Sequence, residues 1–261
     1  MPKRLDSFLF ENGMLQSRSS AKVMILRGSV LVNGRVVEKP AFPVEESDCV
    51  TLSALPKYVG RGGEKLEKAL QVFSVSPKGK TALDVGASTG GFTDCLLSHG
   101  AEKVFALDVG HGQLAAELAA DARVVNLEGL HVKDLSFYHL ENIVPSLITV
   151  DVSFISLGMI FPYLYPFSSP DTDMICLVKP QFEIGRSAKG FVRNKKDHVS
   201  VLNKVLGAAE ENRFGLLGAD FSPIRGGSGN IEFLFHLKRD APSSGIDFEA
   251  LVEAAHRESQ G

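Results

Sequence analysis

Short apolar runs alternate with helix-like patterns along the chain from residue 80 onward. Between one run and the next, apolar residues recur at the spacing of one helix face. Strands that are apolar throughout are typical of a parallel sheet with helices on both faces, so we expect an α/β fold. Strands are predicted over 81–85, 104–108, 124–126, 147–151, 174–178 and 231–237, and helices over 64–72, from Thr93, and over 199–212.

The first fifty or so residues show a different and shorter pattern. Apolar spacing predicts one helix that ends at Asn12-Gly13 and a second, from about Ser19, that ends at Gly28. Apolar runs then flank Asn33-Gly34, a pair that suits the positive φ angles of a type I′ turn, so 30–37 is predicted as a β-hairpin. This part is expected to form a small α/β module.

A connector separates the two patterns. Pro56 and the glycines at 60, 62 and 63 lie close together, and such clusters mark turns and linkers. We therefore expect a small domain over 1–55, a linker over 56–63, a large domain over 64–240, and a C-terminal tail over 241–261 that contains one short helical pattern.

Charge is unevenly distributed along the chain. The net charge of −3 argues by itself against a protein that binds nucleic acid over its whole surface. However, residues 1–44 hold seven lysines and arginines against three acids, and residues 179–204 hold seven against two. Two such basic patches can follow a phosphate backbone although the whole chain is slightly acidic.

Several other classes are disfavoured. The N-terminus has no apolar signal core, and no apolar run approaches the length of a membrane span, so we expect a cytoplasmic protein without a membrane partner. The three cysteines are odd in number, far apart and without metal-ligand spacing. They are expected to be buried, reduced thiols, and no metal site is predicted.

A glycine-rich loop, 86–91, follows the first strand of the expected sheet. Ligands of open parallel sheets bind beyond the carboxyl ends of the strands, and glycines allow close approach of the backbone. Dinucleotide enzymes use a similar loop. Asp84 favours another ligand, because a carboxylate facing the loop would repel a pyrophosphate but attract the ammonium of a methionine moiety.

Asp108 ends the next strand, where a carboxylate can accept hydrogen bonds from ribose hydroxyls. Together with Asp84 it favours S-adenosylmethionine over NAD as the cofactor. The residues expected to contact this cofactor are Asp84, Gly86, Ala87, Ser88, Thr89, Gly90, Gly91, Phe92, Asp108, Asn126 and Leu127.

Four polar residues are expected near the same edge of the sheet: Lys65, Asp151, Lys179 and Glu232. A lysine at the end of an apolar strand is costly to bury unless it is paired, and the two acids can pair it. A ribose hydroxyl is a poor nucleophile at neutral pH, so its methylation needs a base or a strong positive field on the oxygen. A lysine near a second cation and partly removed from water gives up its proton more readily, so Lys179 is the predicted base, with Lys65 as the cation.

In this order the four residues resemble the Lys-Asp-Lys-Glu tetrad of FtsJ-related ribose 2′-O-methyltransferases. The segments 58–66, 84–94, 151–157 and 179–183 are similar to signatures of the TlyA (hemolysin A) family, and the first module is similar to the RNA-binding domain of small-subunit ribosomal protein "S four". The resemblance implies a Rossmann-like class I methyltransferase sheet, mostly parallel with an antiparallel last strand. It also implies 2′-O-methylation of ribosomal RNA, in some members on cytidines, with ribosomal RNA or ribosomal subunits as partners.

After Glu128, this chain lacks the basic residue that is more common in the family. That difference concerns the adenine contact and leaves the tetrad intact. Basic residues of the small domain, the connector and the loop 185–196 are expected to bind RNA phosphates. They are Arg4, Arg18, Lys22, Arg27, Arg61, Arg186, Lys189 and Arg193.

Three alternatives stay open. The family's older name suggests a membrane-active cytolysin, but the chain shows no spanning helix, long cationic amphipathic helix or pattern of barrel strands. A non-catalytic RNA-binding or assembly factor is disfavoured by the complete tetrad. Methylation of a base is disfavoured because the fourth strand ends in Asp151-Val152-Ser153-Phe154, without the prolines typical of base-amine enzymes.

Overall fold

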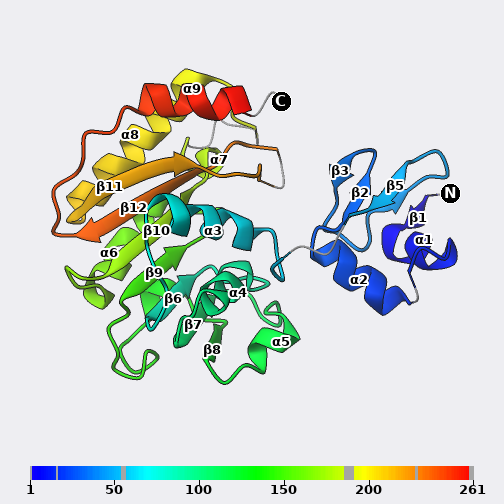
Figure 1. Ribbon diagram of the computed structural model, residues 1–261, viewed down its shortest axis with the longest axis horizontal. Coiled ribbons are helices and arrows are strands. Elements are labelled where there is room, and N and C mark those ends of the chain that lie inside the picture. The colour runs from blue at the N-terminus through cyan, green and yellow to red at the C-terminus, as the bar shows by residue number, and fades with distance from the viewer. Residues whose placement is uncertain (1, 16, 54–56, 185–190, 227–228, 259–261) are drawn as a thin grey trace. The chain divides into compact units, whose positions relative to one another are not determined.

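The computed structural model describes residues 2–15, 17–53, 57–184, 191–226 and 229–258. The chain divides into two compact units, Met1–Gly63 and Glu64–Gly261, and each has a hydrophobic core of its own (Figure 1). Tyr58 and Val59, which lie in the predicted linker, are buried.

The N-terminal unit packs two helices against small antiparallel sheets. Its elements are β1 (Lys3–Arg4), α1 (Leu5–Glu11), α2 (Arg18–Leu26), β2 (Val30–Val32), β3 (Arg35–Val36), β4 (Pro43–Val44) and β5 (Val50–Leu52). The side chain of Ser17 caps α2 by accepting the backbone N–H of Ser20. The predicted hairpin is confirmed: β2 pairs with β3, and Asn33 and Gly34 have φ angles of 52° and 75°.

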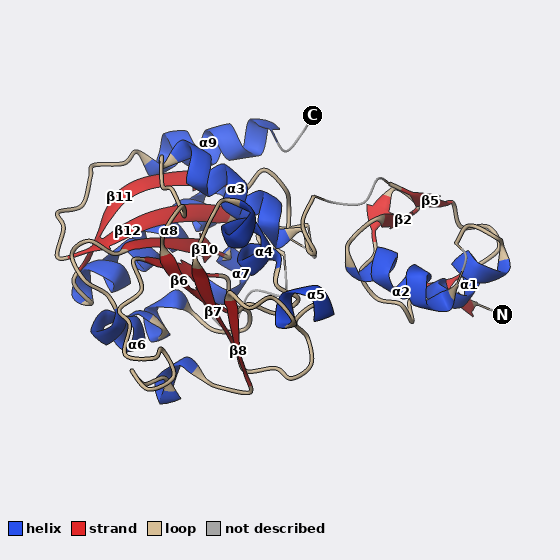
Figure 2. Ribbon diagram, turned by 60° about the horizontal axis from the view of Figure 1, so that its bottom comes forward, coloured by secondary structure: helices blue, strands red, loops and turns tan. Residues whose placement is uncertain are grey.

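Seven strands form the sheet of the C-terminal unit, in the order β11-β12-β10-β9-β6-β7-β8 (Figures 1 and 2). They are β6 (Thr81–Val85), β7 (Lys103–Asp108), β8 (Val124–Glu128), β9 (Leu147–Val150), β10 (Asp173–Val178), β11 (Phe214–Phe221) and β12 (Phe233–Arg239). The five strands from β8 to β10 pair in parallel, and β12 is antiparallel to both of its neighbours. The prediction of a mostly parallel α/β sheet with an antiparallel last strand is therefore confirmed.

Helices connect the strands: α3 (Gly62–Val72), α4 (Gly91–Ser98), α5 (Ala116–Ala119), α6 (Phe161–Leu164), α7 (Pro180–Glu183), α8 (Lys195–Glu211) and α9 (Phe248–Glu258), with three short 3-10 turns, η1 (Val132–Asp134), η2 (Leu157–Met159) and η3 (Tyr165–Phe167). None of the helices in the described part of the chain has the length and apolar character needed to cross a bilayer.

The strand β11 is missing from the sequence-based prediction. Its glycines interrupt the apolar run, but each allows a close contact: a Cβ on Gly215 would collide with the backbone of Ala241, and one on Gly218 would meet the ring of Phe73 at 2.9 Å. β12 begins at Phe233 instead of Ile231. Both differences arise from packing that a local pattern does not contain.

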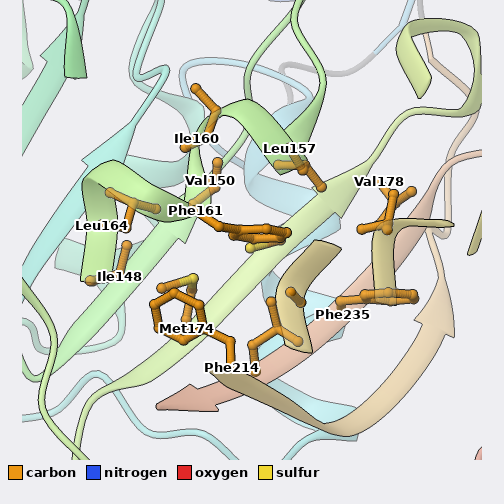
Figure 3. Close-up of a cluster of buried hydrophobic side chains, with 14 of the residues drawn as sticks. Ile148, Val150, Leu157, Ile160, Phe161, Leu164, Met174, Val178, Phe214 and Phe235 are labelled. Carbon is orange, nitrogen blue, oxygen red and sulfur yellow. The ribbon is translucent and has the colours of Figure 1, made fainter. Parts of the chain in front are cut away.

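The main core lies between the sheet and the helices on one of its faces. Figure 3 shows side chains of β9 and β10, such as Val150 and Met174, facing those of η2 and α6, such as Leu157 and Phe161. α9 joins the same core through three buried residues, Phe248, Val252 and Ala255, and the ring of Phe248 stacks on Phe235 at a centroid distance of 5.7 Å. The helical pattern within 241–261 is thus packed structure.

The cysteines differ in exposure. Cys95 and Cys176 are buried, and burial raises the pKa of the Cys176 thiol. Cys49 is exposed, so the expectation of a buried thiol is wrong at this position. It immediately precedes β5, in which Thr51 is exposed and the other two residues are only partly buried.

Candidate active site

A pocket of about 560 Å³ opens at the edge of the sheet where β6, β7 and β9 end. Its volume is within the range of small-molecule sites, roughly 300–1,000 Å³. The wall combines backbone of the glycine loop, two carboxylates and apolar side chains. The lining residues are Val85, Gly86, Ser88, Leu107, Asp108, Val109, Gly110, Gln113, Leu130, His131, Val132, Asp151, Val152, Ser153, Phe154, Ile155 and Ile160.

Left-handed backbone angles shape the glycine loop. Gly86 has a φ of 87°, and a Cβ at this position would collide with the carbonyl of Asp151. The backbone N–H of Asp151 in turn donates to Val85 O at 2.9 Å. The glycine therefore lets the ends of β6 and β9 touch, and this contact brings Asp151 to the pocket wall.

Asp84 lies beneath the loop, with no exposed surface. Its two carboxylate oxygens accept hydrogen bonds from Thr93 Oγ1 at 2.7 Å and Thr149 Oγ1 at 2.9 Å. Burial raises the pKa of Asp84 to about 7, the two hydroxyl donors oppose that rise, and the nearby charge of Asp151 adds to it. Asp84 does not line the pocket. It can therefore act on a ligand through its charge beneath the loop.

Asp108, in contrast, lines the pocket. One of its oxygens accepts the backbone N–H of Ser88 at 2.8 Å, and the other accepts that of Gly110 at 2.7 Å. These two bonds hold the carboxylate in place. Each oxygen keeps a second lone pair, so it can still accept a hydrogen bond from a hydroxyl. The expected ribose contact is compatible with this geometry.

Of the predicted cofactor residues, Gly86, Ser88 and Asp108 line the pocket. Gly91 and Phe92 are buried in α4, and Gly90 caps that helix with a φ of 98°. The structure does not bring the other predicted residues to the pocket wall: Ala87, Thr89, Asn126 and Leu127.

Sequence reasoning missed several pocket residues, because they lie on loops without a strong local pattern. Gln113 accepts a hydrogen bond from Ser88 Oγ at 3.2 Å, and its backbone N–H donates to Glu128 Oε1 at 2.6 Å. His131 caps η1 by accepting the backbone N–H of Lys133 through Nδ1 at 3.0 Å. Phe154 lies at the pocket with 89% of its surface exposed and a φ of 65°.

The four predicted catalytic residues form two ion pairs. Lys179 Nζ lies 2.5 Å from Asp151 Oδ1, and Lys65 Nζ lies 2.6 Å from Glu232 Oε2. All four side chains are largely buried. Lys179 also donates to Ser153 Oγ at 3.0 Å, a partner that sequence reasoning missed.

The register of β10 and β12 brings the two pairs to neighbouring strand ends. Val178 is opposite Phe233 in this antiparallel pair, so Lys179 and Glu232 come next to one another beyond the last paired position. Cross-strand neighbours of this kind lie about 5 Å apart at their Cβ atoms. The sheet thus gathers residues from α3, β9, β10 and the start of β12 at one edge.

Two of the predicted RNA-binding arginines share one buried carboxylate in the N-terminal unit. Arg4 donates to both oxygens of Asp6, at 3.0 and 2.9 Å, and Arg18 Nη2 lies 3.4 Å from Asp6 Oδ2. Asp6 has no exposed surface, whereas about half of each arginine side chain is exposed. The pKa of Asp6 is lowered to about 2, chiefly by its hydrogen bonds from Arg4 and further by Arg18, although burial acts to raise it. The two guanidinium groups are therefore held at the surface of this unit.

The remaining predicted RNA contacts are less closely grouped. Lys22 is exposed on α2, and Arg27 caps the end of that helix. Arg61 lies 3.8 Å from Glu38, within the N-terminal unit. Arg193 is exposed, 5.2 Å from the ring of Phe191. Two further predicted residues, Arg186 and Lys189, lie outside the described residues.

Comparison with known proteins agrees with this architecture. Residues 58–239 match the family described as FtsJ-like methyltransferase. The chain belongs to this methyltransferase family. Residues 3–50 match the S4 domain, so the FtsJ-like part is preceded by an S4 domain, as the resemblance implied.

Relatives of this FtsJ-like protein align along most of its length. It is 43% identical over 236 residues to "Hemolysin A" of Brachyspira hyodysenteriae, and this alignment covers 89% of this chain and 98% of the relative. It is 37% identical to "16S/23S rRNA (cytidine-2'-O)-methyltransferase TlyA" of Mycobacterium tuberculosis, and the alignment covers 97% of this chain and 96% of the relative. A solved structure described as "Putative hemolysin from Streptococcus thermophilus" superimposes with a TM-score of 0.80 at 39% identity. The superposition covers 99% of this chain and 97% of the solved chain.

Proposed function

We propose that this protein transfers the methyl group of S-adenosylmethionine to the 2′-oxygen of a ribose, at a cytidine of ribosomal RNA. The observation that carries the proposal is the Lys179–Asp151 ion pair, whose carboxylate lines the pocket. The Mycobacterium tuberculosis relative, named a cytidine-2′-O-methyltransferase, supports the choice of reaction and substrate. The S4 domain supports an RNA substrate.

The pocket residues fit a nucleoside that carries a cationic tail. Asp108 would accept hydrogen bonds from ribose hydroxyls, and the glycine loop allows close approach of the backbone to the ligand. Asp151 supplies negative charge at the pocket wall, and Asp84 in its ionised form adds to it beneath the loop, which favours an ammonium or sulfonium. When bound, S-adenosylmethionine supplies an electrophilic methyl group.

Lys179 would act on the ribose oxygen. Asp151 holds the Lys179 side chain through an ion pair of 2.5 Å, and the ammonium of this pair can donate a hydrogen bond to the 2′-oxygen. For the lysine to act as the base, its ammonium first passes a proton to Asp151. The neutral amine would then accept the ribose proton as the oxygen binds the methyl carbon, the carbon–sulfur bond would break to release S-adenosylhomocysteine, and Asp151 would return its proton to solvent. Lys65 adds positive potential at the neighbouring strand end, and Glu232 holds it there.

The N-terminal unit would bind the RNA by its phosphates. Arg4 and Arg18 present their guanidinium groups on the surface, anchored through Asp6, and Lys22 lies one helical turn after Arg18. Phosphate contacts position a protein on RNA without reading the base. The identity of the methylated nucleotide therefore depends on RNA shape and on the pocket.

A methyl-transfer assay tests the proposal. Ribosomal subunits from cells lacking the protein are incubated with it and with radiolabelled S-adenosylmethionine, and alkali-resistant linkages in the RNA map any 2′-O-methyl group. The wild type should label one or a few riboses, and Lys179→Ala should lower the rate by at least about a hundredfold. The matched control is Lys103→Ala, because Lys103 is also paired with a carboxylate, Glu141 at 2.6 Å, but at the start of β7, the opposite edge of the sheet. Absence of transfer by the wild type would overturn the proposal.

A further inference from the structure

Another buried acid, Glu183, connects the two segments that carry the Lys179–Asp151 pair. Glu183 ends α7, the short helix that starts directly after Lys179, and only 2% of its surface is exposed. Its Oε2 accepts the hydroxyl of Ser156 at 2.6 Å, and its Oε1 accepts the backbone N–H of Leu157 at 2.8 Å. Both donors belong to the segment 151–157, which follows β9.

These contacts hold the segment 151–157 against α7 at both of its ends. Near the start of the segment, Lys179 contacts Asp151 and Ser153, and near its end Glu183 binds Ser156 and Leu157. Charge-assisted hydrogen bonds to a buried carboxylate are about twice as strong as neutral ones. Glu183 is therefore the principal anchor of the distal end.

The backbone between the two anchors is strained. Phe154 has a φ of 65°, which is unfavourable for a bulky residue. The residue is 89% exposed, and its ring makes a tilted contact with Phe182 at 5.0 Å, so burial contributes little to holding this conformation. A strained, exposed residue persists only where its flanks are fixed. Here Lys179 fixes one flank and Glu183 the other.

We propose that Glu183 is a positioning residue for methyl transfer, which acts by keeping the segment 151–157 in register with Lys179. Within the described part of the chain, its carboxylate bonds to Ser156 and Leu157, not to Lys179 or Asp151, and it lies outside the pocket wall, so its effect passes through the segment. The kinetic part of this inference rests on the proposed function, whereas the structural part does not.

Glu183→Ala and Glu183→Gln test the proposal together. Alanine removes both acceptors. Glutamine keeps an oxygen that accepts the N–H of Leu157, and its NH₂ group can donate a hydrogen bond to Ser156 Oγ. It should therefore keep the segment 151–157 in register with Lys179. The matched control is Lys204→Met, since Lys204 Nζ donates to the backbone carbonyl of Glu183 and not to its carboxylate.

Two measurements are made on the full-length protein, below the unfolding midpoint of every variant. The first is hydrogen exchange without substrate: Glu183→Ala should speed exchange of the Leu157 amide by about tenfold or more, and the other two variants should match the wild type. The second is methyl transfer: Glu183→Ala should lower kcat on the order of a hundredfold, with KM for the RNA changed by less than about threefold, and Glu183→Gln should restore kcat to within about threefold.

The two measurements separate this inference from the proposed function. The positioning role would be overturned if Glu183→Ala kept the wild-type exchange rate of the Leu157 amide, or if it kept the wild-type kcat. It would also be overturned if Glu183→Gln were as slow in methyl transfer as Glu183→Ala. A wild-type protein without methyl transfer would overturn the proposed function, and the exchange measurement would still decide whether Glu183 holds the segment.

Discussion

Lys65 Nζ lies 2.6 Å from Glu232 Oε2, although 167 positions separate the two residues along the chain. Their side chains are 10% and 3% exposed, so each charge depends on the other for compensation. Lys65 lies in α3, the helix at the unit boundary, and Glu232 immediately precedes β12. The pair therefore ties the start of the methyltransferase unit to the last strand of its sheet.

Lys65→Met should destabilise the protein, because it leaves the carboxylate of Glu232 buried without its cation. Breaking one partner of a buried pair costs about 3–5 kcal/mol. Urea unfolding should therefore show a lower midpoint, and the double variant Lys65→Met/Glu232→Leu should recover much of the loss while staying inactive. A double variant with full methyl transfer would contradict a functional role of the pair.

Gly86→Ala should weaken cofactor binding by at least about tenfold. A Cβ at this position would collide with the Asp151 carbonyl. Alanine would also have to adopt a left-handed φ, which costs about 1–2 kcal/mol. Gly79→Ala is the control for backbone strain, because Gly79 has a φ of 72° but its Cβ would meet only Glu102 Oε1, at 3.9 Å. Calorimetric titration with S-adenosylmethionine should show normal affinity for Gly79→Ala, and equal losses in both variants would exclude the proposed collision.

The buried Asp84 should make the protein less stable as pH rises. Burial raises the pKa of Asp84 to about 7, against about 3.9 in an unfolded chain, so the folded state binds this proton more tightly. The contribution is fully present below about pH 4 and is lost as pH rises to about 7, a change on the order of a few kcal/mol.

Asp84→Asn should remove this pH dependence. The variant should unfold at a higher urea concentration than the wild type at pH 8, and the difference should shrink towards pH 4. Its affinity for S-adenosylmethionine should nevertheless fall, because the charge beneath the loop is gone. A variant that keeps the wild-type slope of stability between pH 4 and 7 would show that another group titrates there.

Arg18→Ala should weaken RNA binding and flatten its salt dependence. Each lost phosphate contact lowers the slope of log K against log salt by about 0.7–0.9. Arg123→Ala is the matched control, since Arg123 is also held by an aspartate, Asp121 at 2.7 Å, but belongs to the other unit. Filter binding to ribosomal RNA across a salt series measures both effects. An unchanged slope for Arg18→Ala would remove this arginine from the RNA surface.

The local sequence pattern predicted the elements whose signal lies in adjacent residues. Apolar runs located the parallel strands, and Asn33-Gly34 located the hairpin turn. The glycine loop was correctly assigned to the turn after the first strand of the sheet, because Gly86 must adopt a left-handed angle there. Asp151, Lys179 and Glu232 were recognised because charges at the ends of apolar strands are unusual. Lys65 was recognised at the start of the predicted helix that follows the double glycine.

Long-range contacts decided the rest. β11 is a strand because β12 and α8 cover it, although its glycines weaken its own propensity. Which lysine pairs with which acid followed from strand order and register, and so did the burial of Asp84 under the loop. The role of Glu183 could not be predicted from its neighbours in the sequence. Its role depends on a carboxylate meeting a segment from another strand, so the chain had to fold before that contact existed.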